Sequence, residues 1–100
     1  MRVIAKRTLV QFYEAHADAQ NPLLAWHDSV VKANWQTPQD IKDDFAHASF
    51  VANNRVVFNI GGNKYRLVVE IAYQIGVLWV KFIGTHAEYD KIDVETVNDY

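Results

Sequence analysis

The 100-residue sequence predicts a small α+β domain, with two to three N-terminal helices packed on one face of a small antiparallel β-sheet. In the N-terminal half, two prolines stand where helices are expected to begin. In the C-terminal half, short runs rich in Val, Ile and aromatic residues alternate with turns of Asn and Gly. Half of the residues are hydrophobic, which is enough for one ordinary core, so we expect a single domain over residues 1–100.

The first half of the chain contains the expected helices. Residues 2–4, RVI, predict a short first strand. From about residue 6 to 19, apolar and aromatic side chains recur with the spacing of an amphipathic helix. A second helix is expected to start with Asn21 as N-cap and Pro22 as its first residue, because a missing N–H costs nothing there. The stretch TPQD at 37–40 repeats this arrangement and predicts a third helix.

The stretch from 49 to 84 predicts an antiparallel meander, and its register can be derived. A turn at 62–63 gives the pairs Ile60–Tyr65, Asn59–Arg66, Phe58–Leu67, Val57–Val68, Val56–Val69 and Arg55–Glu70. A second turn, at Ile75, gives Leu67–Phe82, Val69–Val80 and Ile71–Leu78 and sets Arg66 beside Ile83. Both hairpins then share one apolar face for the helices. The opposite, mixed face carries Arg55, Asn59, Arg66, Glu70, Trp79 and Lys81, and is either an ordinary solvated face or a binding surface.

Charge is distributed unevenly along the chain. The net charge is −2 and the isoelectric point about 6.0, unlike a typical basic nucleic-acid-binding protein. Residues 51–83 nevertheless carry four cations against one carboxylate, a local charge of +3. Residues 84–100 carry a local charge of −4. A basic middle is therefore followed by an acidic tail, an asymmetry that either serves a function or arises by chance in a small domain.

Several classes of protein are excluded by composition. The absence of cysteine removes disulfide frameworks, Cys-based zinc sites and thiol nucleophiles. The four histidines are scattered without metal-ligand spacing, so no metal or other cofactor is expected. The N-terminus lacks the apolar core of a secretory signal, and no apolar run approaches the roughly 20 residues of a membrane helix. We therefore expect a cytoplasmic protein without membrane contact.

The segment THAEYD at 85–90 combines a helix start with reactive side chains. Thr85 and Glu88 have the spacing of a capping box, which predicts a helical turn. His86 would lie in its first turn, with Tyr89 and Asp90 three and four residues on and on the same side. A neutral imidazole is suited to general base catalysis and a phenol to proton donation. With nearby cations for a phosphate, these residue types suit metal-free RNA cleavage, although a solvated surface histidine is the alternative.

Three segments together resemble a known family. They are WQTPQDIK at 35–42, NRVVFNIGGNKYRLVV at 54–69 and FIGTHAEYDKID at 82–93. They resemble the HigB toxin family of type II toxin–antitoxin systems, and the similarity extends over nearly the whole chain. The resemblance implies a RelE-like fold and an mRNA interferase, an endoribonuclease acting on ribosome-bound mRNA. It also implies neutralisation by a helix-turn-helix HigA antitoxin, with DNA contacted only through the toxin–antitoxin complex.

The resemblance also implies which residues form the site. The family's motif residues carry over to Asn59, Asn63, Arg66, His86 and Tyr89. Arg66 is expected on the scissile phosphate, His86 as general base or acid, and Tyr89 as its partner or as a base-stacking group. RNA binding is expected from Asn59, Asn63, Lys64 and Lys81, the two lysines as auxiliary cations. The two asparagines are alternatively turn residues.

Two other functions remain open from the sequence. A non-catalytic or degenerate relative could use its mixed sheet face or an edge strand to bind a protein partner. A ribonuclease that needs no ribosome would differ only in its substrate. The low isoelectric point departs from the basic character expected of ribosome-dependent nucleases, so phosphate binding would depend on the local +3 charge of residues 51–83.

Overall fold

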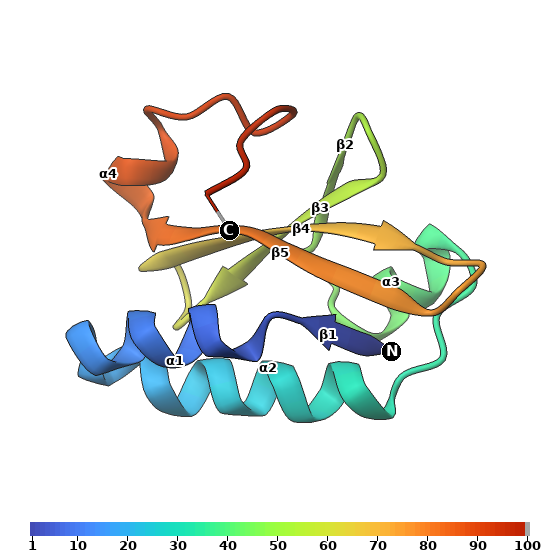
Figure 1. Ribbon diagram of the computed structural model, residues 1–100, viewed down its shortest axis with the longest axis horizontal. Coiled ribbons are helices and arrows are strands. Elements are labelled where there is room, and N and C mark those ends of the chain that lie inside the picture. The colour runs from blue at the N-terminus through green and yellow to red at the C-terminus, as the bar shows by residue number, and fades with distance from the viewer. Residues whose placement is uncertain (100) are drawn as a thin grey trace.

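The computed structural model describes residues 1–99 as a five-stranded sheet with the N-terminal helices against one face (Figure 1). The elements in order are β1 (Arg2–Ile4), α1 (Lys6–Ala15), a 3-10 turn η1 (Ala17–Ala19), α2 (Gln20–Lys32), α3 (Pro38–Asp44), β2 (Ser49–Val51), β3 (Arg55–Ile60), β4 (Tyr65–Ala72), β5 (Val77–Thr85) and α4 (His86–Tyr89). The strand order across the sheet is β1-β5-β4-β3-β2. The predicted α+β class, with N-terminal helices on one face of the sheet, is confirmed.

The first two helices differ from prediction at their junction. The first was expected to reach Ala19, but it ends at Ala15 and a 3-10 turn follows. Asn21 was expected to cap the second helix, but this is wrong: Ala19 occupies the N-cap and the helix starts at Gln20. The reason is that Ala19 already has helical backbone angles, so the chain enters α2 directly from the 3-10 turn without a side-chain cap.

The capping box predicted at α4 is present, and α3, for which Thr37 was predicted as the cap, has a capping box as well. At α3, Thr37 Oγ1 accepts from the Asp40 N–H at 3.3 Å, and Asp40 Oδ2 accepts from the Thr37 N–H at 3.1 Å. At α4, Thr85 Oγ1 accepts from the Glu88 N–H at 3.2 Å, and Glu88 Oε1 accepts from the Thr85 N–H at 2.8 Å. Each box satisfies two amides that the helix backbone leaves without partners, which explains why both helices begin where they do.

The first hairpin has the predicted register. All six predicted pairs between β3 and β4 are present, from Arg55–Glu70 to Ile60–Tyr65. Residues 61–64 form the connecting loop, in which Gly61 and Gly62 have φ angles of +64° and +67°. A side chain at either position would be strained by these left-handed angles, so the glycines permit the tight return.

The second hairpin contains a bulge that the sequence did not reveal. The predicted pairs Val69–Val80 and Ile71–Leu78 are correct, but a register shift follows between Val68 and Val69. The predicted pair Leu67–Phe82 is therefore wrong. Val68 faces Phe82, Leu67 faces Ile83, and Arg66 lies beside Gly84 instead of Ile83. An extra residue in one strand turns every later side chain onto the other face.

The short N-terminal strand also changes the nature of the sheet. β1 pairs with β5 in parallel, with Arg2, Val3 and Ile4 opposite Val77, Leu78 and Trp79. The sheet is therefore mixed, with four antiparallel strands and one parallel edge strand.

Two hydrophobic cores lie on opposite faces of the sheet. The larger core joins α1, α2 and α3 to the inner face and includes Leu23, Trp26, Ile41, Phe58 and Leu67. The smaller core consists of Val57, Val68 and Phe82, covered by Val51, Tyr89, Ile92, Val94 and Val97. The chain after α4 thus folds back over the sheet on the side away from α1 and α2 (Figure 1). The mixed face was expected to be either solvated or a binding surface, but much of it is covered by the acidic tail. Within residues 1–99, no helix has the length and apolar character needed to span a membrane.

Candidate active site

The face of the sheet away from α1 and α2, here called the outer face, is built from three rows of side chains across β3, β4 and β5. The strand pairing gives the rows Arg55–Glu70–Trp79, Val57–Val68–Phe82 and Asn59–Arg66–Gly84. The C-terminal segment, residues 90–99, contacts the first two rows through Arg55 and through the smaller core. In the third row Asn59 is exposed and Arg66 half-buried, so its polar groups reach solvent; Glu70 of the first row is also half-buried.

Arg66 is the cation of this third row. Its Nη2 donates to Asn63 Oδ1 at 2.7 Å, and its Nη1 donates to the carbonyl oxygens of Asn63 and Tyr65, both at 3.2 Å. All three acceptors are neutral. Within residues 1–99, no carboxylate forms an ion pair with Arg66. The hairpin loop therefore orients the guanidinium and leaves its positive charge uncompensated, which suits a phosphate-binding group.

His86 lies at the same end of the sheet as Arg66. Its backbone N–H donates to the Lys64 carbonyl at 3.1 Å, so the first residue of α4 is joined to the loop that leads into Arg66. The imidazole is exposed, and its Nδ1 lies 3.7 Å from Asp90 Oδ2. The prediction that Asp90 lies on the same side of the turn as His86 is confirmed. With Nδ1 directed at the carboxylate, Nε2 is the nitrogen available for proton exchange with a substrate.

The helix that carries His86 is too short to have a large dipole. α4 comprises only the four residues His86–Tyr89. A macrodipole is the sum of aligned peptide dipoles, so one turn contributes little of it. What distinguishes His86 is thus the nearby carboxylate of Asp90, rather than its position at the start of a helix.

Tyr89 is held against the sheet instead of extending into solvent. Its ring centroid lies 6.5 Å from that of Phe82, and it covers the smaller core. Phe82 in turn lies over Gly84, where an added Cβ would come within 2.5 Å of Phe82 Cζ. Gly84 therefore provides the space in which the Phe82 ring lies, and this ring supports Tyr89 next to the Asn59–Arg66–Gly84 row.

Lys64 was predicted to bind RNA and is engaged within the protein. Its Nζ lies 2.6 Å from Asp18 Oδ2, and the Tyr65 hydroxyl donates to the other oxygen of Asp18. The Lys64 hydrogen bond, followed by that of Tyr65, lowers the pKa of Asp18, while Asp18 raises the pKa of both partners. Asp18 thereby anchors the last residue of the hairpin loop and the first residue of β4, and offsets the charge of Lys64.

The other cations of the basic middle segment contact the acidic C-terminal segment. Arg55 is 6% exposed, and its Nη1 donates to the carbonyl oxygens of Val94 at 3.0 Å and Val97 at 2.6 Å. Lys81 Nζ donates to Asn98 Oδ1 at 3.3 Å. The predicted cluster of four cations is thus divided: Arg66 lies in the open row, Lys64 pairs with Asp18, and the other two bind the C-terminal segment.

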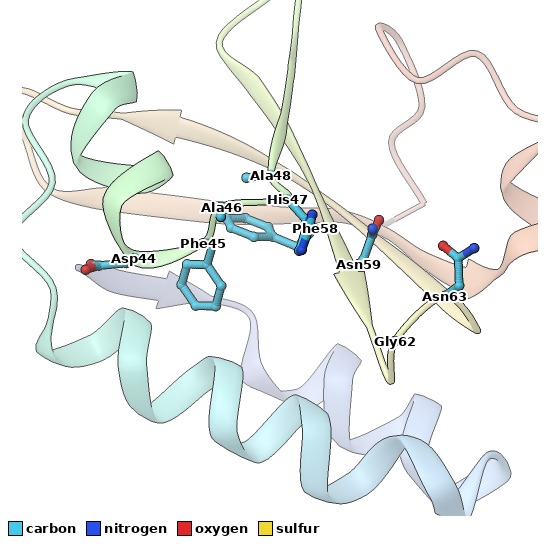
Figure 2. A pocket seen from close by; sticks show the side chains of 9 residues that line it. All are labelled: Asp44, Phe45, Ala46, His47, Ala48, Phe58, Asn59, Gly62 and Asn63. Carbon is cyan, nitrogen blue, oxygen red and sulfur yellow. The ribbon is translucent and has the colours of Figure 1, made fainter.

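An open cavity of about 590 Å³ adjoins the same hairpin loop. It is lined by Asp44, Phe45, Ala46, His47, Ala48, Phe58, Asn59, Gly62 and Asn63. Figure 2 shows His47, Asn59 and Asn63 in succession along the cavity. The structure therefore brings both predicted asparagines to one cavity. Asn59 is not a turn residue, because it lies within β3, whereas Asn63 belongs to the hairpin loop.

Two residues at this end of the molecule were not found from the sequence. His47 lines the cavity, but nothing in the spacing of FAHAS at 45–49 distinguishes it from a surface loop residue. Asp18 contacts Lys64 and Tyr65 across 46 and 47 positions of chain, and no local pattern reports such a contact. Within residues 1–99, no three His, Asp or Glu side chains are grouped so that they could hold a metal ion.

Comparison with known proteins gives a consistent family assignment. A family model described as HigB_toxin, the RelE-like toxic component of a toxin–antitoxin system, matches residues 19–92. The mRNA interferase toxin HigB of Escherichia coli (strain K12) is 25% identical over 96 residues, covering 90% of this chain and 88% of that protein. The mRNA interferase HigB of Shigella flexneri matches with the same values.

A further relative is more similar in sequence. The mRNA interferase HigB of Escherichia coli O6:H1 (strain CFT073) is 32% identical over 97 residues, covering 92% of this chain and 91% of that protein. The matched region contains the capped α3 and α4, the β3–β4 hairpin and the Asn59–Arg66–Gly84 row. The chain belongs to the HigB toxin family, the RelE-like toxic components of toxin–antitoxin systems, and an antitoxin is accordingly its partner.

Proposed function

We propose that this protein is an mRNA interferase that cleaves ribosome-bound mRNA in the cytoplasm and so inhibits translation and growth. The observation that carries the proposal is Arg66, a sheet cation held by three neutral acceptors beside the strand that leads to His86. The relatives named as mRNA interferases support the same activity. A helix-turn-helix antitoxin of the HigA type would neutralise the enzyme, with DNA contact only through that complex.

The proposed chemistry is cleavage of RNA by its own 2′-hydroxyl. A base removes the 2′ proton, the 2′ oxygen forms a bond to phosphorus, and the bond from phosphorus to the 5′ oxygen breaks. An acid then protonates the departing 5′ oxygen. Arg66 stabilises the charge that develops on the phosphate, because a guanidinium matches two of its oxygens. His86, paired with Asp90, acts in proton transfer through Nε2.

The roles of the remaining predicted residues follow from their surroundings. Tyr89 is the partner of His86 in proton transfer or stacks on a base, since its ring is held in place by Phe82. Asn59 and Asn63 contact RNA beside Arg66. Lys64 and Lys81 are the weaker members of the proposed RNA-binding set, because Asp18 and Asn98 already engage their ammonium groups.

The test is cleavage of a defined mRNA, with and without translating ribosomes, by the wild type and by Arg66→Ala. We expect cleavage only with ribosomes and its loss in the variant. Arg7→Ala is the matched control, because Arg7 is an exposed arginine on α1. Cleavage of free RNA would keep the nuclease and change its substrate. A folded wild type that cleaves under neither condition would instead favour a protein-binding module.

A further inference from the structure

The cavity beside the hairpin loop lies where the sheet edge is uncovered. β2 pairs with β3 only as far as Val57, so residues 58–60 of β3 have no neighbouring strand on that side. The α3–β2 connection, residues 45–48, borders this opening on one side and the hairpin loop on the other (Figure 2). The cavity volume of about 590 Å³ falls in the range of small-ligand sites.

The lining of the cavity combines aromatic rings with exposed polar side chains. The half-buried ring of Phe45 forms the apolar wall, and Phe58, which is 1% exposed, supports it edge to face with ring centroids 5.1 Å apart. His47, Asn59 and Asn63 are exposed and supply neutral amides and an imidazole. The lining also includes the carboxylate of Asp44, which accepts a hydrogen bond from Trp35 Nε1 at 2.8 Å. An amide offers a hydrogen-bond donor and an acceptor side by side, and the edge of a nucleobase presents a complementary pair.

We propose that this cavity is a subsite for one unpaired nucleobase of RNA, with His47 as a base-contacting residue. The proposal rests on the proposed function and specifies where the substrate lies. Asn63 both lines the cavity and accepts from Arg66, so a phosphate on Arg66 and a base in the cavity would belong to neighbouring positions of one strand. Single-stranded RNA is recognised by such stacking on aromatic or histidine rings and by hydrogen bonds to base edges.

A protein partner is a less suitable occupant for this opening. Addition of a peptide strand requires a sheet edge long enough for several main-chain hydrogen bonds. The uncovered edge here is three residues long, from Phe58 to Ile60, and a loop borders it at either side. The uncompensated charge of Arg66 beside the cavity favours an anionic ligand.

The experiment uses a variant that fills the cavity and a matched variant that does not. Ala46→Trp adds a bulky side chain at an exposed position of the cavity lining. Ala52→Trp makes the same change at an exposed position in the β2–β3 turn, outside the lining. His47→Ala is the second test variant. Each protein is titrated at constant pH with a short unstructured RNA, and the side-chain NMR signals of His47, Asn59 and Asn63 are followed.

The expected result is that all three signals shift in the wild type and in Ala52→Trp, and that Ala46→Trp weakens RNA binding. His47→Ala should weaken binding about 5- to 100-fold, the range found for loss of one base stack. Unmoved signals, or equal binding by Ala46→Trp and Ala52→Trp, would overturn the subsite. mRNA cleavage is measured in parallel, so RNA that binds here without being cut would refute the proposed function and leave the subsite standing.

Discussion

The guanidinium of Arg66 donates to the side-chain oxygen of Asn63 at 2.7 Å and to the backbone oxygen of the same residue at 3.2 Å. One residue of the hairpin loop therefore fixes the direction of the sheet cation. Because neither acceptor is charged, this contact orients the arginine without competing for its charge as a carboxylate would. The preorganised cation is the feature from which the catalytic predictions follow.

Asn63→Ala should lower kcat/KM for mRNA cleavage roughly 3- to 10-fold, because Arg66 loses one oriented hydrogen bond of about 1 kcal/mol. Arg66→Ala should cost about 100- to 1,000-fold, the usual effect of removing one charge-stabilising group. The double variant should lose more than Arg66→Ala alone but less than the product of the two losses, because Asn63 both orients the arginine and lines the proposed RNA site. Single-turnover cleavage measures all three. Losses that simply multiply would show that Asn63 does not act through Arg66.

His86→Ala should reduce the rate of cleavage about 100- to 10,000-fold, the range expected when a general acid or base is lost. Asp90→Asn should have a smaller effect, because the imidazole remains and only its charged neighbour at 3.7 Å is removed. Rapid-quench measurement of the chemical step tests both variants. His27→Gln on α2 is the control for general loss of a histidine. Full activity in His86→Ala would move the proton transfer to another group.

Arg55→Ala should destabilise the fold by about 2–4 kcal/mol, because a nearly buried cation that binds two carbonyl oxygens and lies 3.4 Å from Glu70 is removed. Amide hydrogen exchange should rise in residues 94–99. Lys81→Ala is the control, since it removes an exposed contact to the same segment and should change stability by less than about 0.5 kcal/mol. Urea denaturation of both variants tests the difference. Equal stabilities would mean that Arg55 does not hold the segment.

Gly84→Ala should destabilise the protein by about 1–3 kcal/mol, the cost of overpacking a site that cannot adjust freely. The added Cβ would meet the Phe82 ring at 2.5 Å. Gly84→Ala should cost less stability when it is added to Phe82→Leu than when it is added to the wild type, because the clashing ring atoms are then absent. Thermal unfolding of the four proteins gives the coupling. An unchanged melting temperature in Gly84→Ala would show that the ring moves aside without cost.

The hydrogen bonds of Asp18 should make the stability of the fold depend on pH. Hydrogen bonding to Lys64 and Tyr65 lowers the pKa of Asp18 below its ordinary value of 3.8 in the folded protein. The folded state therefore binds this proton less readily than the unfolded state, so the stabilisation is complete above pH 3.8 and is lost as the pH falls through the lower, folded value. The difference in urea midpoint between wild type and Asp18→Asn should shrink from pH 6 to pH 2.5.

The pKa of a second carboxylate is lowered as well, and this group serves as an internal reference. The Thr85 N–H lowers the pKa of Glu88, so this group also loses stabilising contact in acid. Both the wild type and Asp18→Asn retain Glu88, and its contribution cancels in their difference. A difference in urea midpoint that stays constant with pH would show that Asp18 contributes nothing through its charge.

Local patterns carried much of the information about this fold. Thr37 and Thr85 with their acidic partners start α3 and α4 as predicted, because a capping box is complete within four residues. The β3–β4 register also followed from the sequence, since alternation of apolar side chains admits one alignment across a short glycine loop. The pairing of His86 with Asp90 is likewise local, being set by helical spacing.

Contacts between distant segments could not be predicted in this way. The bulge opposite Val68 and Val69 has no glycine or other local signal, and it moved Arg66 from Ile83 to Gly84. Ala19, the last residue of the 3-10 turn, has helical backbone angles, so α2 starts at Gln20 and Asn21 does not cap it. No sequence marker announced that turn.

By itself, the sequence determined the class of fold, the starts of α3 and α4, the first hairpin and the residue types of the candidate site. Each of these depends on residues that are neighbours in the chain or on the spacing at which apolar side chains recur. Only the tertiary structure decided which cations stay open. Arg55 is bound by the C-terminal segment and Lys64 by Asp18, whereas Arg66 meets neutral acceptors. The physical reason is that a cation is neutralised by the carboxylates and other acceptors within a few ångströms of it. Tertiary packing decides which residues these are, because it brings together residues that lie far apart in the chain.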